Sequence, residues 1–112
     1  MKLQDIDNDD LLDAVQTCAS WYGVHWFEMM SRNPKNERDH KPVQRAKGML
    51  AAILFYMYDV PYNQIGPAMG RHHTTIMYAV RNANTEAFNA IRMELADRQR
   101  RRSAPTEMSV AV

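Results

Sequence analysis

One stretch, NQIGPAMGRHHTTIMYAV at residues 63–80, decides the arrangement that we expect for this chain. Residues 63–69 can form about two helical turns, and Gly70 is a typical turn residue. A second helix is predicted from Thr74 to Asn82, because the apolar residues Ile76, Met77 and Val80 share one helical face. The stretch therefore predicts a helix, a glycine turn and a second helix, which is the layout of a helix-turn-helix.

Helices are predicted on both sides of this motif. The expected helices cover residues 7–22 with Gly23 as their stop, 26–31, 42–57 and 84–102, where Asn84 or Thr85 can cap the last one. The segment from Pro42 to Met57 carries the widest apolar stripe and is the expected centre of the core. No alternating strand pattern competes, so the predicted fold class is all-α, a compact helical domain with a helix-turn-helix.

Length and composition predict one small domain. The chain has 112 residues, and we expect an acidic N-terminal segment at 1–10, a folded domain at 11–102 and a flexible tail at 103–112. The longest apolar run, residues 49–58, is shorter than the roughly 20 residues that span a bilayer. The acidic start also lacks the layout of a signal peptide. These features predict a cytoplasmic protein that does not contact a membrane.

The charge is unevenly distributed along the chain. Residues 1–28 hold one Lys against six Asp and Glu, a net charge of −5, whereas residues 29–112 hold 13 Lys and Arg against seven acids, a net charge of +6. Such asymmetry indicates an anionic partner for the basic part. The basic run at residues 98–102 has two open interpretations, a solvated helix end or an additional phosphate contact.

The residue types give little support to catalysis or metal binding. Cys18, the single cysteine, excludes an internal disulfide and a Cys-rich zinc site, and we expect an inert packed thiol. His72 and His73 point to different helix faces, and neither has a His or Cys four residues away. No catalytic set of side chains emerges, so we expect no enzyme activity, no cofactor and no metal. The aromatic residues Trp21, Tyr22, Trp26 and Phe27 are expected in the core.

The start of the second helix of the motif carries side chains suited to DNA. Arg71 can fork onto guanine or pair with a phosphate, and the hydroxyls of Thr74 and Thr75 can donate or accept hydrogen bonds. A helix-turn-helix inserts this second helix into the major groove with its N-terminus first, and a helix N-terminus also favours phosphate. The blander interpretation of the same residues is an ordinary capped helix start.

Residues 70–76, Gly-Arg-His-His-Thr-Thr-Ile, resemble the signature of the C-terminal DNA-binding domain of the bacterial replication initiator DnaA, a TrpR-like helix-turn-helix. That signature is Gly-Arg-Asp-His-Thr-Thr before an aliphatic residue. Gln64-Ile65-Gly66 resembles its Glu-Ile-Gly, and Arg45-Ala46-Lys47 lies where it has basic residues opening the central helix. The likeness covers roughly residues 11–95. Here His72 replaces the family's Asp, one Gly precedes Arg71, and no phosphate-binding loop of an ATPase is present.

The resemblance implies a role for each matching residue. His73, Thr74 and Thr75 would contact bases in the major groove, with Arg71 and His72 beside them. The implied phosphate contacts are Arg45, Lys47, Tyr62 and Asn63. The basic loop at residues 32–41 would reach the adjacent minor groove; the spacing from Lys47 puts Asp39 where the family has an Arg, so Arg38 or Lys41 is the candidate.

Together these features predict a sequence-selective protein that binds double-stranded DNA. Without an ATPase, its expected use is as a transcriptional regulator that marks a promoter and recruits or blocks RNA polymerase or a companion regulatory protein, with the acidic N-terminal segment as the contact surface. Two alternatives stay open. One is a phage-type replication-origin binder or DNA-packaging component such as a terminase small subunit, and the other is a protein-interaction module that no longer binds DNA.

Overall fold

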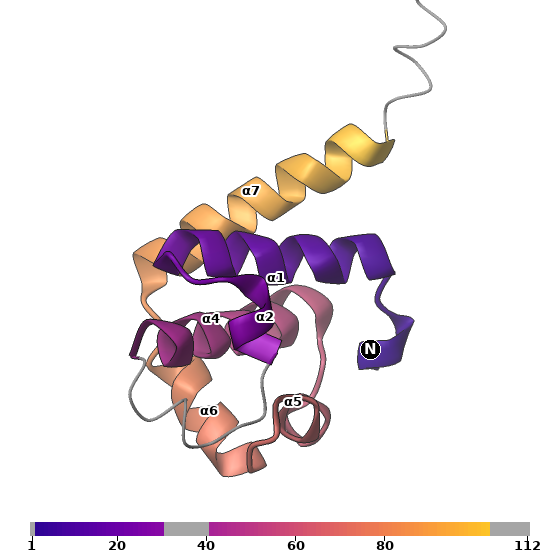
Figure 1. Ribbon diagram of the computed structural model, residues 1–112. Coiled ribbons are helices and arrows are strands. Elements are labelled where there is room, and N and C mark those ends of the chain that lie inside the picture. Colours follow the sequence, from indigo (N-terminus) through magenta and orange to yellow (C-terminus); the bar gives the residue numbers. More distant parts are fainter. Residues whose placement is uncertain (1, 31–40, 104–112) are drawn as a thin grey trace, which may run out of the picture.

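The computed structural model describes residues 2–30 and 41–103, and within these ranges the chain is helical and contains no strand (Figure 1). The elements are a short 3-10 helix η1 (Leu3–Asp5) and the helices α1 (Asn8–Tyr22), α2 (Trp26–Met30), α4 (Lys41–Tyr58), α5 (Tyr62–Met69), α6 (His73–Arg81) and α7 (Thr85–Ser103). The predicted compact all-α class is confirmed. Within the described ranges, no helix combines the length and apolar character needed to cross a bilayer.

Local sequence signals explain where the helices begin and end. The Asp7 side chain caps α1 by accepting a hydrogen bond from the backbone N–H of Asp9 at 2.8 Å. Gly23 and Gly70 end α1 and α5 in the left-handed conformation, each with φ of 68°. Of the two predicted caps for α7, Asn84 fills the role, because its Oδ1 accepts from the N–H of Ala87 at 2.9 Å. The predicted helices are therefore found within about two residues of their expected ends.

Helix α4 is the centre of the core, as its apolar stripe predicted. It runs through the middle of the molecule, with α1 on one side and the α5–α6 pair on the other (Figure 1). Its buried side chains are Val43, Ala46, Lys47, Met49, Leu50, Ala51, Ala52, Ile53 and Leu54. Gly48 brings α6 close, since a Cβ at this position would lie 3.4 Å from the Cβ of Ala79. The core therefore fixes α6 against the middle of the fold.

Three aromatic residues that were predicted in the core lie at the surface. Trp21, Trp26 and Phe27 are 50%, 48% and 57% exposed, which corrects that prediction. Helix α2 has only five residues, and its inward side is occupied by Met29, which is 3% exposed. A helix this short buries one narrow face, so Trp26 and Phe27 remain outside.

The acidic N-terminal segment is integrated into the domain. Ile6 belongs to the core with 6% exposure, and the backbone N–H of Leu3 donates to Oε1 of Gln64 on α5 at 2.9 Å. The domain thus includes residues before the predicted boundary at position 11, because burial of Ile6 holds the preceding turn in place. The predicted basic loop lies almost entirely at residues 31–40, and the predicted tail at 104–112; both stretches lie outside the described residues.

The basic end of α7 forms ion pairs within the protein. Arg102 lies 2.6 Å from Asp10 and 2.7 Å from Asp13 on α1. Arg100 and Arg101 lie 2.6 Å and 2.7 Å from the carboxylate oxygens of Asp97. The sequence left two interpretations open for this run, a solvated helix end and a phosphate contact. Neither of them included these ion pairs. Acidic side chains of α1 and α7 neutralise much of the positive charge here.

Candidate nucleic-acid interface

A tight junction connects α5 to α6. The backbone N–H of Arg71 donates to the carbonyl of Gly66 at 2.8 Å, which brings the turn back against α5. A Cβ on Gly66 would lie 2.7 Å from the carbonyl oxygen of Arg71 and 3.2 Å from the nitrogen of His73. Only glycine permits this approach. Gly66 therefore determines where α6 begins relative to α5, and with it the position of every side chain in the first turn of α6.

His72 caps α6 with its imidazole ring. Its Nδ1 accepts a hydrogen bond from the backbone N–H of Thr74 at 3.2 Å. An accepting Nδ1 carries no proton, so in the neutral ring Nε2 is the donor. We expected an ordinary capped helix start as one interpretation of this stretch, and the cap is His72 itself. The ring of His73 lies beside it, with centroids 4.2 Å apart.

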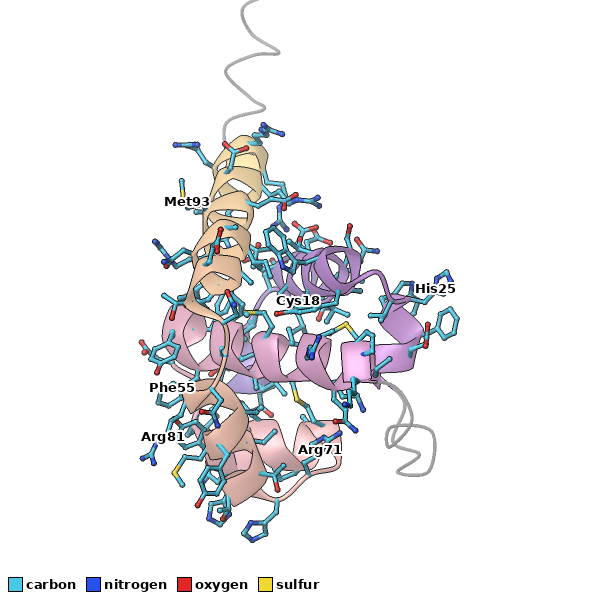
Figure 2. The ribbon with its side chains drawn as sticks, turned by 90° about the vertical axis from the view of Figure 1, so that its left-hand side faces the viewer. Cys18, His25, Phe55, Arg71, Arg81 and Met93 are labelled. Carbon is cyan, nitrogen blue, oxygen red and sulfur yellow. The ribbon has the colours of Figure 1, made fainter. Side chains whose placement is uncertain are left out.

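The first turn of α6 projects away from the core. His72, His73 and Thr75 are exposed and Arg71 and Thr74 are half-buried, whereas Ile76 and Val80 on the opposite side are 2% and 3% exposed. Figure 2 shows Arg71 and Arg81 on opposite sides of the helix-turn-helix, at the end of the molecule away from Met93 of α7. Three of the five residues of the predicted recognition turn are therefore open to solvent, and the other two are partly covered.

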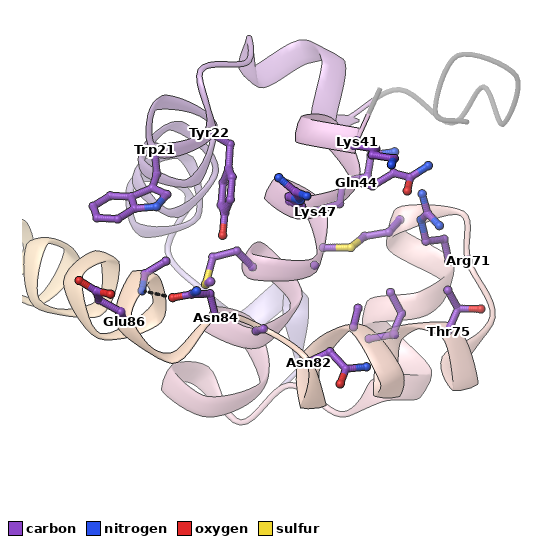
Figure 3. A pocket seen from close by; sticks show the side chains of 18 residues that line it. Trp21, Tyr22, Lys41, Gln44, Lys47, Arg71, Thr75, Asn82, Asn84 and Glu86 are labelled. Carbon is purple, nitrogen blue, oxygen red and sulfur yellow. Dashed lines mark hydrogen bonds between the residues drawn. The ribbon is translucent and has the colours of Figure 1, made fainter. Parts of the chain in front are cut away.

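An open groove of about 920 Å³ runs along one flank of α6. Its walls come from the end of α1, the first half of α4, α6 and the start of α7 (Figure 3). Figure 3 shows Lys41, Gln44 and Arg71 together at one end, with Trp21 and Glu86 at the other. Five predicted site residues line this groove: Lys41, Arg45, Lys47, Arg71 and Thr75. Four of the five are cationic, so the groove is suited to an anion.

Lys47 differs from the other cations because it lies inside the protein. Its exposure is 2%, and it shares the buried side of α4 with Val43 and Leu50, four residues before it and three after it. In this arrangement it adds positive potential to the floor of the groove and is not itself on the open surface. Arg45 is exposed and lies close enough to Tyr22 to influence it: burial raises the pKa of the Tyr22 hydroxyl, and the charge of Arg45 opposes that rise.

Two predicted residues of α5, Tyr62 and Asn63, do not line the groove. Tyr62 stacks its ring on Phe55, with centroids 4.3 Å apart and planes 9° from parallel, and so contributes to packing. Asn63 is exposed at the start of α5 and is not among the residues that line the groove. Arg38 lies outside the described residues. Arg71 and Thr75 thus share the groove with the start of α4, whereas the other described site residues do not line it: His72, His73, Thr74, Tyr62 and Asn63.

The outward side of α6 continues beyond the residues that the sequence singled out. Tyr78 is 58% exposed, and Arg81 and Asn82 are exposed one turn further on. Tyr78 follows Thr74 and Thr75 by four and three residues, so it shares their side of the helix. This spacing is visible in the sequence and could have identified Tyr78, but the predicted site residues on α6 were limited to its first turn.

Comparisons with known proteins give no independent family assignment. No protein-family model matches the chain, and no curated protein matches it. Within residues 2–30 and 41–103, no three His, Cys, Asp or Glu side chains gather in a way that could hold a metal ion. The geometry and charge described above therefore provide the basis for a functional assignment.

Proposed function

We propose that this protein binds double-stranded DNA in a sequence-selective way, with α6 in the major groove, and that it acts as a transcriptional regulator. The observation that carries the proposal is the position of the exposed first turn of α6 directly beside a groove lined by Lys41, Arg45, Lys47 and Arg71. Base recognition and phosphate neutralisation need these two features side by side.

The base contacts come from the first turn of α6. His73 and Thr75 are exposed, so the imidazole, the hydroxyl and the Thr methyl are open to the edges of bases. Arg71 precedes the helix and can fork onto guanine or hold the phosphate beside it. Nδ1 of His72 accepts from the backbone N–H of Thr74. The Nε2–H group on the other side of the ring is therefore the one that can donate to DNA. These are the residues that resemble the DnaA signature, and we propose that they contact bases in a similar way.

The phosphate contacts come from the groove end where Lys41 and Arg71 meet (Figure 3). Arg45 lies on the same wall of α4 as Lys41, one helical turn further along. The groove has a carboxylate, Glu86, at its other end. The phosphates of a DNA strand are therefore attracted to the Lys41–Arg71 end and repelled near Glu86. The duplex should approach from the Lys41–Arg71 end.

The partner contact is proposed for the N-terminal segment. Asp5, Asp7 and Asp9 are exposed there, whereas Asp10 and Asp13 form ion pairs with arginines of α7. The hydrogen bond from Leu3 to Gln64 fixes this segment to α5, in the helix-turn-helix itself. A basic surface of RNA polymerase or of a companion regulatory protein would meet these carboxylates while α6 is bound to DNA.

The proposal is tested by selecting duplexes from a random library and then measuring affinity for an enriched and a scrambled duplex at several salt concentrations. We expect enrichment of a defined sequence. The affinity should fall with salt along a slope that gains about 0.9 for each phosphate contact, or about 3 for Lys41, Arg45 and Arg71 together. Absence of any enriched duplex, or a flat salt response, would contradict the proposal. Mapping bound sites in cells then separates promoters from an origin or a packaging site.

A further inference from the structure

Tyr78 lies in the middle of the outward side of α6 and is 58% exposed. We propose that Tyr78 is a specificity-determining residue, and that it selects thymine at a base pair next to those contacted by Thr74 and Thr75. This inference rests on the proposed function, since it requires α6 to lie in the major groove.

The first argument is position along the helix. Each residue advances an α-helix by about 1.5 Å, so Tyr78 lies about 4.5 Å beyond Thr75 and about 6 Å beyond Thr74. Base pairs are separated by about 3.4 Å, so with α6 lying along the major groove this advance corresponds to the next one or two base pairs. Ile76 and Val80 are buried against the core, and they hold α6 in the rotation that keeps Tyr78 outward.

The second argument is the surroundings of the ring. Thr75 and Asn82 flank Tyr78 on one side of the helix, and Thr74 and Arg81 flank it on the other. Arg81 is exposed and offers a cation one turn beyond Tyr78. A phosphate held by Arg81 would keep the second turn of α6 near the groove, which brings the Tyr78 ring within reach of base edges.

The third argument is chemical. Thymine presents a C5-methyl group and the O4 acceptor in the major groove, whereas cytosine presents the N4 amino donor and has no methyl group. The Tyr78 ring offers an apolar surface to that methyl group, and its hydroxyl can donate to O4. A tyrosine at this position therefore favours thymine over both cytosine and uracil.

The experiment uses the full chain and the duplex enriched by the wild-type protein. Each thymine is replaced in turn by uracil, which removes only the methyl group, and by cytosine. Wild type is expected to lose affinity about fourfold for uracil at one position, as one buried methyl group requires. Tyr78→Ala should bind the thymine and uracil duplexes equally at that position. Tyr78→Phe should keep the uracil effect, because the ring stays, and lose part of the preference for thymine over cytosine.

Tyr56 provides the matched control. It is 57% exposed on α4, and its ring packs edge-on against Phe55 and Phe88, at centroid distances of 5.0 Å and 5.6 Å. Tyr56→Ala should leave the discrimination between thymine, uracil and cytosine unchanged. Thermal unfolding of Tyr78→Ala should match wild type closely, because an exposed side chain contributes little to stability.

Each outcome bears on one of the two proposals. If every uracil effect of the wild type persists in Tyr78→Ala, or if Tyr78→Ala loses affinity equally on every duplex, the role of Tyr78 is overturned. If Thr75→Ala loses selectivity while Tyr78→Ala retains it, the inference on Tyr78 fails and the proposed function stands. If the wild-type chain enriches no duplex at all, the proposed function fails, and the role of Tyr78 fails with it.

Discussion

Two regions of this protein are rich in positive charge, and they differ in what surrounds them. At the end of α7, Arg102 pairs with Asp10 and Asp13, and Arg100 and Arg101 pair with Asp97. The groove beside α6 is lined by four cationic residues, with Glu86 as the carboxylate at its far end. Helix α6 and the C-terminal end of α7 lie at opposite ends of the described structure (Figure 1).

The comparison shows that the density of arginine in the sequence does not locate an anion-binding surface. The run at residues 98–102 has the highest local density of basic residues in the chain. Its arginines nevertheless form ion pairs with acidic side chains of α1 and of α7 itself. Three cations of the groove come from residues 41–47 of α4, and the fourth, Arg71, joins them only in the folded protein. Because acids of α1 and α7 pair with the arginines of residues 98–102, we expect the groove beside α6, and not this run, to meet phosphate.

The largest effect is expected from Gly66→Ala, which should displace α6 and with it the recognition turn beside the groove. The new Cβ would lie 2.7 Å from the Arg71 carbonyl oxygen, so the turn must shift and the free energy of unfolding should fall by about 1–3 kcal/mol. Selective DNA binding should be lost with it. Chemical denaturation and affinity for the enriched duplex are the measurements.

Gly48→Ala is the matched control for this change, since its Cβ would meet Ala79 at an ordinary 3.4 Å. Because alanine is a better helix former than glycine, this variant should be as stable as wild type or more stable. If Gly66→Ala behaves like Gly48→Ala in both measurements, the α5–α6 junction does not position the recognition turn.

The next effect distinguishes the two basic regions directly. Replacing Lys41 and Arg45 by Ala should weaken binding to every duplex and reduce the salt slope by about two units, one for each lost phosphate contact. Replacing Arg100 and Arg101 by Ala removes the same amount of charge and should leave the slope nearly unchanged. Fluorescence anisotropy at four salt concentrations measures both. Equal slopes for the two double variants would contradict the assignment of the groove.

A smaller effect is expected from His72→Ala, which removes the cap of α6. Loss of the Nδ1 acceptor for the Thr74 N–H should lower the free energy of unfolding by about 0.5–2 kcal/mol. His72→Asp supplies a carboxylate acceptor and should restore the stability. Urea denaturation of the three proteins is sufficient. An unchanged midpoint in His72→Ala would show that the imidazole does not stabilise the start of α6.

The smallest effect concerns Asp97 and the pH dependence of the α7 end. The hydrogen bond from Arg100, followed by the charge of Arg101, holds the pKa of Asp97 below its usual value of 3.8. A carboxyl whose pKa is lower in the folded state contributes stability above the unfolded pKa, and loses it as the pH falls through the folded pKa. Asp97→Asn should therefore show a weaker loss of stability below about pH 4. Urea midpoints between pH 2 and 7 measure this; coincident profiles for both proteins would refute it.

Much of the fold could be predicted from local signals. Gly23 and Gly70 marked two helix ends, Asn84 marked a cap, and the apolar stripe of residues 42–57 identified the central helix. These features act within one turn of the chain, so the sequence displays them directly. The exposed Trp26 and Phe27 could not be predicted in the same way, because their position depends on how short α2 is and on Met29 filling its inward side.

The candidate site was predictable in its first turn and less so around it. The exposure of His72, His73 and Thr75 at the start of α6 followed from the motif alone. Lys47 was assigned a surface role by resemblance, although its spacing from Val43 and Leu50 already indicated the buried side of α4. The pairing of Arg98 and Arg102 with α1 brings together residues that are more than 80 positions apart in sequence, which no local pattern indicates.

We propose that the first turn of α6, and not the basic end of α7, meets DNA. An NMR titration of the ¹⁵N-labelled chain with the enriched duplex tests it most directly. We expect the backbone amide signals of residues 71–75 to shift or broaden strongly, while those of residues 100–102 stay close to their positions in the free protein. Changes concentrated at residues 100–102, with residues 71–75 unmoved, would contradict it.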